Sequence, residues 1–557
     1  IKRPFQAKNT RKLDAIRDEI DNLNLIWEDK SLDELTKENT QNNRNYSGRS
    51  DENVLQVSIE VPDTRSLQQS VVRSRLQSDR CFILMEEMTI KPRSCNMELV
   101  SESGGRTTKS CGSMFKYVAP NSLDYYREFT TENNNIRFGL GAIKNLETNT
   151  IDTGDTAWVL ISSAMVLLMT MPALGLFYGG MVRKKNILST FYYSFGAAII
   201  VSILWVVCLY SLSFGGADIK SIIGNLDKVM LKGVEMTSIY PTAPSIPEIV
   251  FSFFQLTFAI ITVALISGAL VERMRFSAWL IFAAVWSIVV YAPLAHMVWN
   301  PDGVLFKLGA LDFAGGLVVH ISSGVSALVA CIMLGERVRY KKEAMMPSNI
   351  PFVFIGASLL WFGWFGFNGG SALGANALAG SAVLVTNTCA AVAALTWMLI
   401  EWKAHGKPSI IGAASGLVAG LVAITPAAGF VDVNAAVLMG IVVSFLCYFF
   451  VVKVKKHFNY DDSLDAFGIH GVGGTWGAIA TGLFANPKVN ALGTGLFYGN
   501  PKQLWIQLIS VGVGYAIAII GTVVVISILK KLTKVRVEPQ EEINGLDLVL
   551  HGERVSE

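Results

Sequence analysis

The chain has few charged side chains for its length. Of its 557 residues, 16% are Asp, Glu, Lys or Arg, whereas soluble domains carry about 25%. The two signs nearly balance at a net charge of +3, so the composition provides no general basic surface for nucleic acid. This shortage of charge, together with 51% hydrophobic residues, favours a membrane protein.

Cysteine and histidine are also scarce. The seven Cys and six His show no spacing typical of a zinc site, and four of the cysteines fall in apolar runs that suit small buried side chains. The chain also lacks a nucleophile elbow and a phosphate-binding loop. We therefore rank an enzyme last among the function classes and expect neither cofactor nor metal.

The chain changes character near residue 150. Residues 1–150 contain no apolar run long enough to cross a membrane. Within them, 11–35 predict an amphipathic helix, 37–53 a polar linker and 53–62 a short strand. We expect an extra region of unknown role that is partly disordered.

From about residue 155 onward, apolar segments of roughly 18 to 25 residues follow one another, which is the length that a membrane-crossing helix needs. We expect eleven crossings. They start near Thr156, Ser189, Ile249, Ser277, Asp312, Ile350, Ala382, Ser409, Val433, Ala466 and Leu504. The predicted fold class is an all-α polytopic membrane protein with its membrane domain at 151–530.

Basic residues cluster in alternate loops. VRKKN, ERMR, GERVRYKK, EWKAHGKPS and KVKKH follow the odd-numbered spans, and KKLTKVR opens the carboxyl tail. By the positive-inside rule these clusters are cytoplasmic. The span region would then begin outside and end inside, and residues 531–557 would form a cytoplasmic tail. We expect the protein to lie in the cell membrane, that is, the inner or plasma membrane.

Two histidines lie inside apolar, glycine-rich segments. His320 follows Asp312 by eight residues, and His470 follows Asp465 by five. Each segment closes a group of five predicted spans, which indicates two inverted five-helix halves plus one extra helix. Either ring could simply pack against a neighbouring helix, but an ionisable group in a bilayer usually faces the bundle interior or a water-filled path. A pair of imidazoles there could pass a proton.

Aromatic and hydroxyl side chains occupy the predicted outer ends of the spans. Phe254 and Phe258 share one helix face, while Trp299 and Ser371 end the fourth and sixth spans. Taken singly, each aromatic residue is better explained by packing, lipid contact or an interfacial belt. Together, a hydroxyl beside aromatic faces could hold a small cation. Asp312 begins its span and could attract cations or cap the helix, and capping is favoured.

Residues from about 151 to 553 resemble the Amt/Mep/Rh family of ammonium transporters. The resemblance rests on ALGLFYGGMVRKKN, GALVERMRFSAWLIF, APLAHMVW, GALDFAGGLVVHI, WFGWFGFNGGSAL, EWKAHGKPSIIGAASG, DAFGIHGVGGTWG and GLDLVLHGE, in the family's order. It implies a homotrimer of eleven-span protomers in the lipid bilayer, each with a narrow pore between its two halves. Residues 1–150 depart from the family and could be a sensor, a partner-binding module or an artefact of gene prediction or fusion.

The resemblance implies an outer site and a gate. Trp299, Phe258 and Ser371 would recognise ammonium, and Phe254 and Phe258 would be the stacked rings of the gate. The presence of Trp299 and Ser371 with the two histidines favours the Amt/Mep branch over the Rh branch.

The resemblance also implies a pore lined by His320, His470 and Trp364, with Asp312 and Asp465 in supporting positions. Ammonium would lose a proton at the outer site, ammonia would cross the apolar pore, and the histidines would relay the proton. An ammonium sensor and a channel for neutral ammonia or carbon dioxide are the alternatives. In bacterial relatives a PII signalling protein docks on the cytoplasmic face, so the tail is expected to be regulatory, with an ordinary solvated tail as the alternative.

Overall fold

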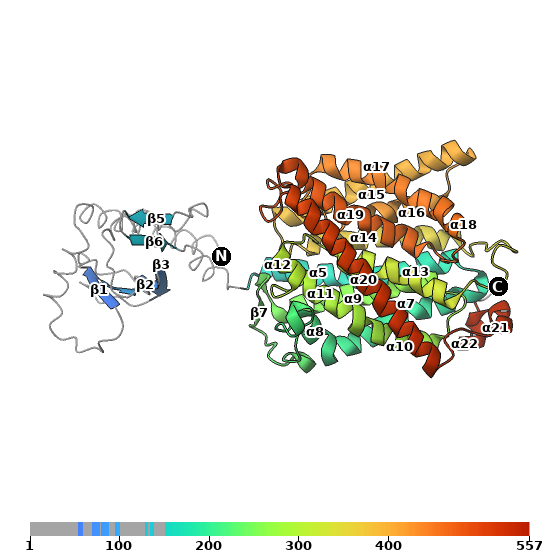
Figure 1. Ribbon diagram of the computed structural model, residues 1–557, viewed down its shortest axis with the longest axis horizontal. Helices are drawn as coiled ribbons and strands as arrows, with labels where there is room; N and C mark the ends of the chain where they lie inside the picture. The colour runs from blue at the N-terminus through green and yellow to red at the C-terminus, as the bar shows by residue number, and fades with distance from the viewer. Residues whose placement is uncertain are drawn as a thin grey trace, which may run out of the picture. The chain divides into compact units, whose positions relative to one another are not determined.

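The computed structural model describes residues 151–555 and, before them, the six strands that span 54–59, 70–77, 80–87, 95–100, 128–131 and 134–138. The chain divides into two units, Ile1–Thr150 and Ile151–Glu557 (Figure 1). Each unit is described by itself.

The described part of the first unit consists of strands. β1 (Val54–Ile59) pairs antiparallel with β4 (Cys95–Val100), and a four-stranded sheet has the order β2-β3-β6-β5. Its strands are β2 (Ser70–Gln77), β3 (Arg80–Glu87), β5 (Glu128–Thr131) and β6 (Asn134–Phe138). The short strand predicted within 53–62 is therefore confirmed, and the other strands were not predicted. The predicted helix at 11–35 and the linker at 37–53 lie outside the described residues.

The second unit is a bundle of apolar helices. Within residues 151–555, nine helices are long and apolar enough to cross a membrane. They are Thr153–Met181, Lys184–Phe214, Glu248–Ala269, Phe276–Leu308, Gly316–Leu334, Ile350–Gly370, Ala377–His405, Val433–Phe458 and Pro501–Leu532. This confirms a polytopic helical membrane protein, and all nine lie where the sequence predicts spans.

The two remaining predicted spans are also helical. α16 (Ile410–Ile424) is apolar but has only 15 residues. The π-helical turn η10 (Phe467–Gly471) continues into α19 (Val472–Phe484). These two segments fall short of the length or hydropathy of the other nine, so eleven crossings remain a prediction.

Several spans contain π-helical or 3₁₀ turns, which are labelled η. The first two spans comprise α5 (Thr153–Leu168), η1 (Met169–Leu174), α6 (Gly175–Met181), η2 (Lys184–Asn186), α7 (Ile187–Leu204), η3 (Trp205–Leu209) and α8 (Tyr210–Phe214). The next three comprise α9 (Glu248–Ile266), η6 (Ser267–Ala269), α10 (Phe276–Trp286), η7 (Ser287–Tyr291), α11 (Ala292–Trp299), α12 (Val304–Leu308), η8 (Gly316–Ile321) and α13 (Ser322–Leu334). Later helices are α14 (Ile350–Gly370), α15 (Ala377–His405), α17 (Val433–Phe449), η9 (Phe450–Val454), α18 (Lys455–Phe458), α20 (Pro501–Leu532), α21 (Pro539–Asn544) and α22 (Leu546–His551). Short elements between spans are η4 (Ile219–Ser221), η5 (Val229–Leu231), η11 (Leu496–Tyr498) and the hairpin strands β7 (Ile239–Tyr240) and β8 (Ala243–Pro247).

Polar residues cap the starts of several spans. Asp152, Asn349, Asn376, Ser409 and Asp432 each accept a hydrogen bond from a backbone N–H three residues later. Such bonds satisfy donors that the first turn of a helix leaves without intrahelical partners. The sequence thereby fixes where these helices begin.

Glycines allow α16 to pack closely on α15. A Cβ atom at Gly412 would lie 2.1 Å from Glu401 Oε1, and one at Gly416 would lie 2.5 Å from Trp397 Cβ. Gly420 continues the row one turn further on. The repeat of small residues every fourth position is therefore a helix-packing face, as the sequence indicates.

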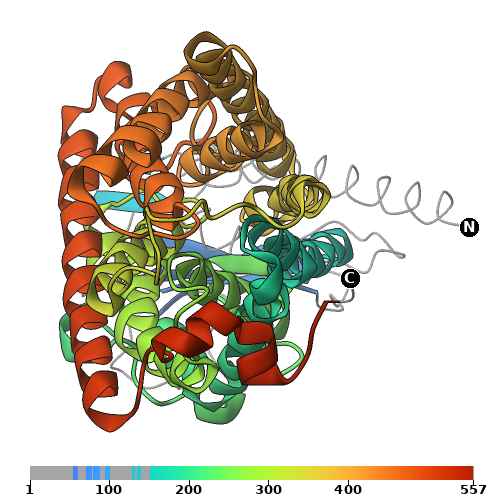
Figure 2. The same cartoon turned by 90° about the vertical axis from the view of Figure 1, so that its right-hand side faces the viewer.

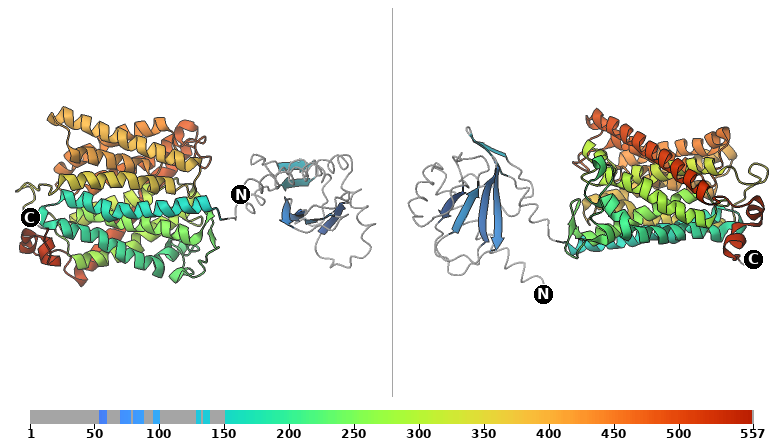
Figure 3. Two further views of the ribbon diagram at one scale, coloured as in Figure 1. Left: turned by 180° about the vertical axis from the view of Figure 1, so that it is seen from behind. Right: turned by 60° about the horizontal axis from the view of Figure 1, so that its bottom comes forward.

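The last span and the tail tie the bundle together. α20 runs obliquely across one face of the bundle and packs on α13, α19 and α10 (Figures 1 and 3). Beyond α20, the short helices α21 and α22 lie across one end of the bundle (Figure 2), and α22 packs on α7. α12 and α18 mark opposite ends of the same bundle (Figure 1).

Candidate functional site

The two histidines meet inside the bundle. His320 lies on η8 and His470 on η10, and their Nδ1 atoms are 3.3 Å apart. The rings are nearly parallel, with centroids separated by 5.4 Å. Both side chains are buried. Residues 150 positions apart are thus brought into direct contact, as expected for residues that act as a pair.

This contact constrains the protons of the two rings. A hydrogen bond between two Nδ1 atoms needs one ring to donate and the other to accept, so neutral rings must adopt opposite tautomers. His320 Nε2 is buried and has no hydrogen-bond partner within residues 151–555. A proton taken up at one Nε2 could displace the shared proton and be released from the other Nε2. The geometry can therefore carry a proton along the pair.

Asp312 caps the helix that carries His320. Its carboxylate accepts hydrogen bonds from four backbone N–H groups, those of residues 315 to 318, at 2.5 to 3.2 Å. Burial raises the pKa of this carboxyl, and the four donors oppose that shift. The Asp312 carbonyl also accepts a 2.9 Å hydrogen bond from Trp299 Nε1. One residue thus fixes both a histidine helix and an aromatic ring of the predicted outer site.

The corresponding cap in the second half is Asp462 rather than Asp465. Asp462 accepts hydrogen bonds from the N–H groups of Ala466 and Phe467 at 3.1 and 2.8 Å. Asp465 instead pairs with Lys455 at 2.6 Å. The Asp465 carboxylate is engaged by Lys455, whereas the first N–H groups of the helix donate to Asp462. The sequence could have indicated Asp462 as the cap, since Asp462 precedes His470 by eight residues, as Asp312 precedes His320.

The stacked aromatic pair is Phe258 with Phe367, not Phe258 with Phe254. The Phe258 and Phe367 rings have centroids 4.2 Å apart and planes 28° apart. Phe254 meets Phe258 edge-on at 4.8 Å and 66°. Neighbours four residues apart on α9 follow one another along its axis, whereas Phe367 approaches from α14 and can lie face to face. Phe367 could have been found from its place three residues after Trp364 and four before Ser371.

Aromatic rings continue from this stack to the histidines. Phe367 lies 6.1 Å and Trp364 5.5 Å from the His320 ring, measured between centroids. Trp364 Nε1 donates to the Thr425 hydroxyl at 2.9 Å, which holds the indole in place. The predicted pore residue Trp364 therefore does contact the histidine pair.

The residues of the predicted outer site gather around Phe258. The Trp299 ring meets Phe258 edge-on, with centroids 5.9 Å apart. Ser371 is joined to the same cluster through Phe367, because its hydroxyl donates to the Phe367 carbonyl at 2.8 Å. That bond leaves the Ser371 oxygen with lone pairs that can accept from a donor such as ammonium. Trp299 and Ser371 are only half-buried, so this end of the cluster is the more accessible one.

Ion pairs hold the loops at the other end of the bundle. Arg337 bridges Glu272 at 2.7 Å and Asp461 at 2.8 Å. Arg183 also contacts Glu272, and Arg273 contacts Asp461. Burial alone would raise the pKa of Glu272, but Arg337 and Arg183 lower it to about 2. One member of this network, Asp461, directly precedes the cap Asp462 in the chain.

The carboxyl tail docks beside this network. Asp547 accepts hydrogen bonds from the N–H groups of Leu188 and Ser189 at 3.1 and 2.7 Å, at the start of α7. Glu542 accepts from the N–H of Val338, the residue after Arg337 in the chain, at 2.6 Å. The predicted tail is therefore held by specific contacts with the start of α7 and with the loop after α13.

Comparison with known proteins identifies the family. Residues 157–556 match the model of the Ammonium Transporter Family. The chain belongs to the ammonium transporter family. It is 50% identical over 402 residues to the ammonium transporter of Bacillus subtilis (strain 168), covering 72% of this chain and 98% of that protein. The ammonium transporter Amt1 of Archaeoglobus fulgidus is 47% identical over 401 residues, with the same coverage.

Solved structures agree with this assignment. Saccharomyces cerevisiae Mep2 superposes with a TM-score of 0.66 at 35% identity, covering 72% of this chain and 90% of that chain. A protein described as a sensor Amt protein gives a TM-score of 0.66 at 29% identity, covering 73% of this chain and all of that chain. This member of the family is therefore a multi-pass protein of the cell membrane, and its relatives are named as transporters rather than enzymes.

Proposed function

We propose that this protein takes up ammonium electrogenically by separating it into ammonia and a proton. Ammonium would be held by Trp299, Phe258 and Ser371 and lose its proton there. Neutral ammonia would pass the Phe258–Phe367 stack and the pore, while His320 and His470 relay the proton.

The physical reason lies in the cost of desolvation. A bare cation in an apolar pore would pay a penalty on the order of ten kcal/mol or more. Ammonia carries no charge, so the apolar rings between the aromatic stack and the histidines would not impose this penalty on it. Potassium has a similar size but no proton to lose, so it would be rejected.

The observation that carries the proposal is the 3.3 Å contact between the two buried Nδ1 atoms. A packing role would need only apolar contacts around each ring, and it gives no reason for two titratable rings to share a proton inside a membrane helix bundle. The membership in the ammonium transporter family supports the substrate.

The first test is a current measurement on the full chain in proteoliposomes on a solid support. An ammonium pulse should give a sustained current, and an equal potassium pulse should give none. Equal currents for the two cations would contradict the proposal, and so would the absence of any ammonium current.

A sensor is the second candidate, because the chain resembles a solved protein described as a sensor. It would bind ammonium with little current. A channel for neutral ammonia or carbon dioxide would change the internal pH of the vesicles without moving charge. Parallel recordings of current, internal pH and ammonium binding separate the three functions.

We also propose the topology and assembly that accompany this function. The membrane domain at 151–530 would cross the bilayer eleven times as two inverted five-helix halves plus α20, with the carboxyl tail at 531–557 inside. The positions of α12 and α18 at opposite ends of the bundle are consistent with this arrangement. Cysteine labelling from either side at Lys307→Cys and Lys456→Cys should show opposite accessibility, and equal accessibility would contradict it.

The protomers would form homotrimers, and a PII-type protein would bind the cytoplasmic face beside the docked tail. Native mass spectrometry of the purified protein should give a threefold mass. Addition of a PII protein should lower the ammonium current and should not do so after removal of residues 533–557.

Residues 1–150 would form a separate outer region, whose deletion should leave the current intact.

A further inference from the structure

The last span carries two buried glutamines that the proposed proton pathway does not use. Gln503 and Gln507 lie one turn apart on α20, and they are 6% and 0% exposed. A buried amide costs free energy unless its hydrogen bonds are made, and α20 is long and apolar enough to cross a membrane. The hydrogen bonds of the two amides therefore indicate what these side chains hold.

Gln507 binds both main-chain groups of one residue in the loop before the His320 helix. Its Oε1 accepts from the Leu311 N–H at 2.8 Å, and its Nε2 donates to the Leu311 carbonyl at 2.8 Å. Nε2 also donates to the Ala478 carbonyl of α19 at 3.0 Å. These partners settle the orientation of the amide, because a backbone N–H only donates and a carbonyl only accepts. Gln507 thus pairs with Leu311 as a neighbouring antiparallel strand would.

Leu311 needs such a partner. It lies in no helix or strand and is only 7% exposed. A buried main-chain group that loses its hydrogen bond is strongly unfavourable, so the amide of Gln507 fixes where this residue lies. Gln503 supports the same loop two residues earlier, since its Nε2 donates to the Gly309 carbonyl at 2.9 Å. The course of the loop is therefore set from α20.

The residue after Leu311 holds an aromatic ring of the proposed outer site. The Asp312 carbonyl accepts the 2.9 Å hydrogen bond from Trp299 Nε1. On the other side, the Phe313 N–H donates to the Pro426 carbonyl at 3.1 Å. The carbonyl that holds the indole thus lies between two anchored neighbours, and a series of contacts runs from α20 to the aromatic cluster.

We propose that Gln507 is a positioning residue of the outer cation site. It holds Leu311 so that the Asp312 carbonyl keeps the Trp299 indole against Phe258, where the two rings meet edge-on. The inference rests on the proposed function, in which these two rings help to hold ammonium. A ring attracts a cation that lies over its face within about 6 Å, so a turned indole loses affinity. The helix outside the two proposed five-helix halves thereby sets how tightly the cation is held.

The first test measures the ammonium current of Gln507→Met in proteoliposomes over a range of ammonium concentrations. Methionine keeps the length and the apolar character of the side chain but cannot replace the amide. We expect the half-saturating concentration to rise about fivefold, the size of one lost hydrogen bond, with little change in the maximal current. An unchanged half-saturating concentration would overturn the proposal.

A double-variant cycle separates positioning from a general structural role. Trp299→Phe lacks the indole N–H and cannot bond to the Asp312 carbonyl. In that background, adding Gln507→Met should raise the half-saturating concentration no further, because the two changes act on one series of contacts. A further rise by the same factor as in the unmodified chain would show that Gln507 acts independently of Trp299, and it would contradict the proposal.

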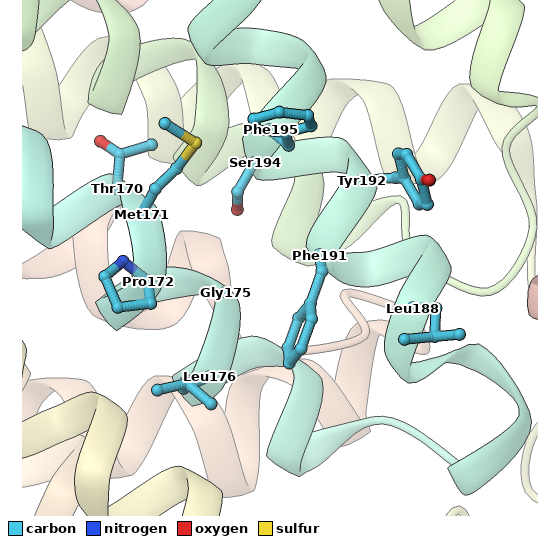
Figure 4. A pocket seen from close by; sticks show the side chains of 10 residues that line it. All are labelled: Thr170, Met171, Pro172, Gly175, Leu176, Leu188, Phe191, Tyr192, Ser194 and Phe195. Atoms are coloured by element: carbon cyan, nitrogen blue, oxygen red, sulfur yellow. The ribbon is translucent and has the colours of Figure 1, made fainter. Parts of the chain in front are cut away.

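Two control variants test for general loosening of the bundle. Gln503→Met removes the amide that bonds to Gly309 and should raise the half-saturating concentration less than Gln507→Met does. Leu176→Ala lies elsewhere, at an apolar hollow of about 350 Å³ between the first two spans (Figure 4), and should leave it unchanged. A rise in Leu176→Ala as large as that in Gln507→Met would assign the effect to loosening and overturn the proposal.

The position of the indole can be followed without any transport. The indole N–H resonance of Trp299 is identified in the nuclear magnetic resonance spectrum of the full chain by its absence in Trp299→Phe. Gln507→Met should shift this resonance upfield, as weakening of its hydrogen bond requires, and an unchanged resonance would contradict the proposal. Where Gln507→Met does not fold, Gln507→Glu keeps the acceptor for Leu311 but loses the Nε2 donors, and it should give a shift in the same direction.

This measurement also separates the inference from the proposed function. Absence of ammonium current in the unmodified chain would contradict the proposed transport, while the resonance would still decide whether Gln507 positions Trp299. A normal ammonium current with an unchanged resonance in the Gln507 variants would overturn the positioning role alone.

Discussion

The helices that carry the two histidines share one local design but differ in what surrounds it. In each, an aspartate eight residues before the histidine caps the first turn. Asp312 accepts four backbone hydrogen bonds and also holds Trp299, beside the aromatic cluster. Asp462 accepts two and follows Asp461, which belongs to the ion-pair network. The same device is therefore joined to the aromatic cluster at one end of the bundle and to the ion-pair network of the loops at the other.

The two ends of the bundle therefore differ in the interactions that hold them. The end near Asp312 carries the aromatic cluster, in which Trp299 is only half-buried. The end near Asp462 is held by buried arginines and carboxylates that form ion pairs, which costs desolvation but specifies a single arrangement of the loops. Changes at the two ends should consequently have different effects.

The largest loss of stability is expected when the ion-pair network is broken. Asp461→Ala leaves Arg337 and the fully buried Arg273 without their partner. Removal of one member of a buried pair costs about 3–5 kcal/mol, and thermal unfolding in detergent should report it. A variant at an exposed pair, Glu343→Ala beside Arg339, should change the unfolding temperature little. Similar unfolding temperatures for the two variants would show that the network does not support this end.

The loss of stability on removing each cap should follow the number of backbone hydrogen bonds that the cap accepts. Asp312→Ala removes the acceptor of four backbone donors and should cost about 2 kcal/mol, the upper end for helix caps. Asp462→Ala removes the acceptor of two and should cost about 1 kcal/mol. Chemical unfolding of both variants under identical conditions measures the difference. A larger cost for Asp462 would contradict the assignment of the stronger cap to Asp312.

Phe367 and Phe254 should contribute differently to cation selectivity, because only Phe367 stacks on Phe258. Phe367→Ala removes the stacked partner of Phe258, which is worth about 1 kcal/mol beyond area burial, or roughly fivefold in a rate or affinity. We expect it to change the ratio of ammonium to potassium current by about that factor. Phe254→Ala removes only the edge-on neighbour and should change the ratio less. An equal or larger effect of Phe254→Ala would contradict the greater importance of the Phe258–Phe367 stack.

The smallest effect is expected from acidification of the tail. Burial lowers the pKa of His551, which Asp547 and Glu553 only partly offset. A lowered pKa in the docked tail means that docking favours the neutral His551 ring. The stabilisation of the docked tail by this ring is therefore present above about pH 6.5 and is lost as the pH falls below that value. Hydrogen exchange of residues 539–551 should quicken between pH 7.5 and 5.5. His551→Gln should remove this dependence, whereas exchange that is equally slow at both pH values in the unmodified chain would contradict it.

The sequence predicted the class of fold and most of the candidate site. The apolar runs located the helices because a lipid environment leaves helical spans few alternatives, and single positions such as His320, His470 and Trp364 met as expected. Phe367 was missed because the partner of a stacked ring depends on how α14 crosses α9, which no local pattern gives. Asp462 was missed because Asp465, which lies nearer to His470, fits the same coarse pattern of an aspartate before a histidine. The tail contacts of Asp547 and Glu542 likewise depend on residues hundreds of positions away.

The central claim is that the histidine pair carries the proton that ammonium gives up. The most direct test is the ammonium and potassium current of the double variant His320→Ala/His470→Ala, measured in proteoliposomes beside the unmodified chain at equal protein content. The account predicts that the variant loses the ammonium current or begins to conduct potassium. An ammonium current of unchanged size, with potassium still excluded, would contradict it.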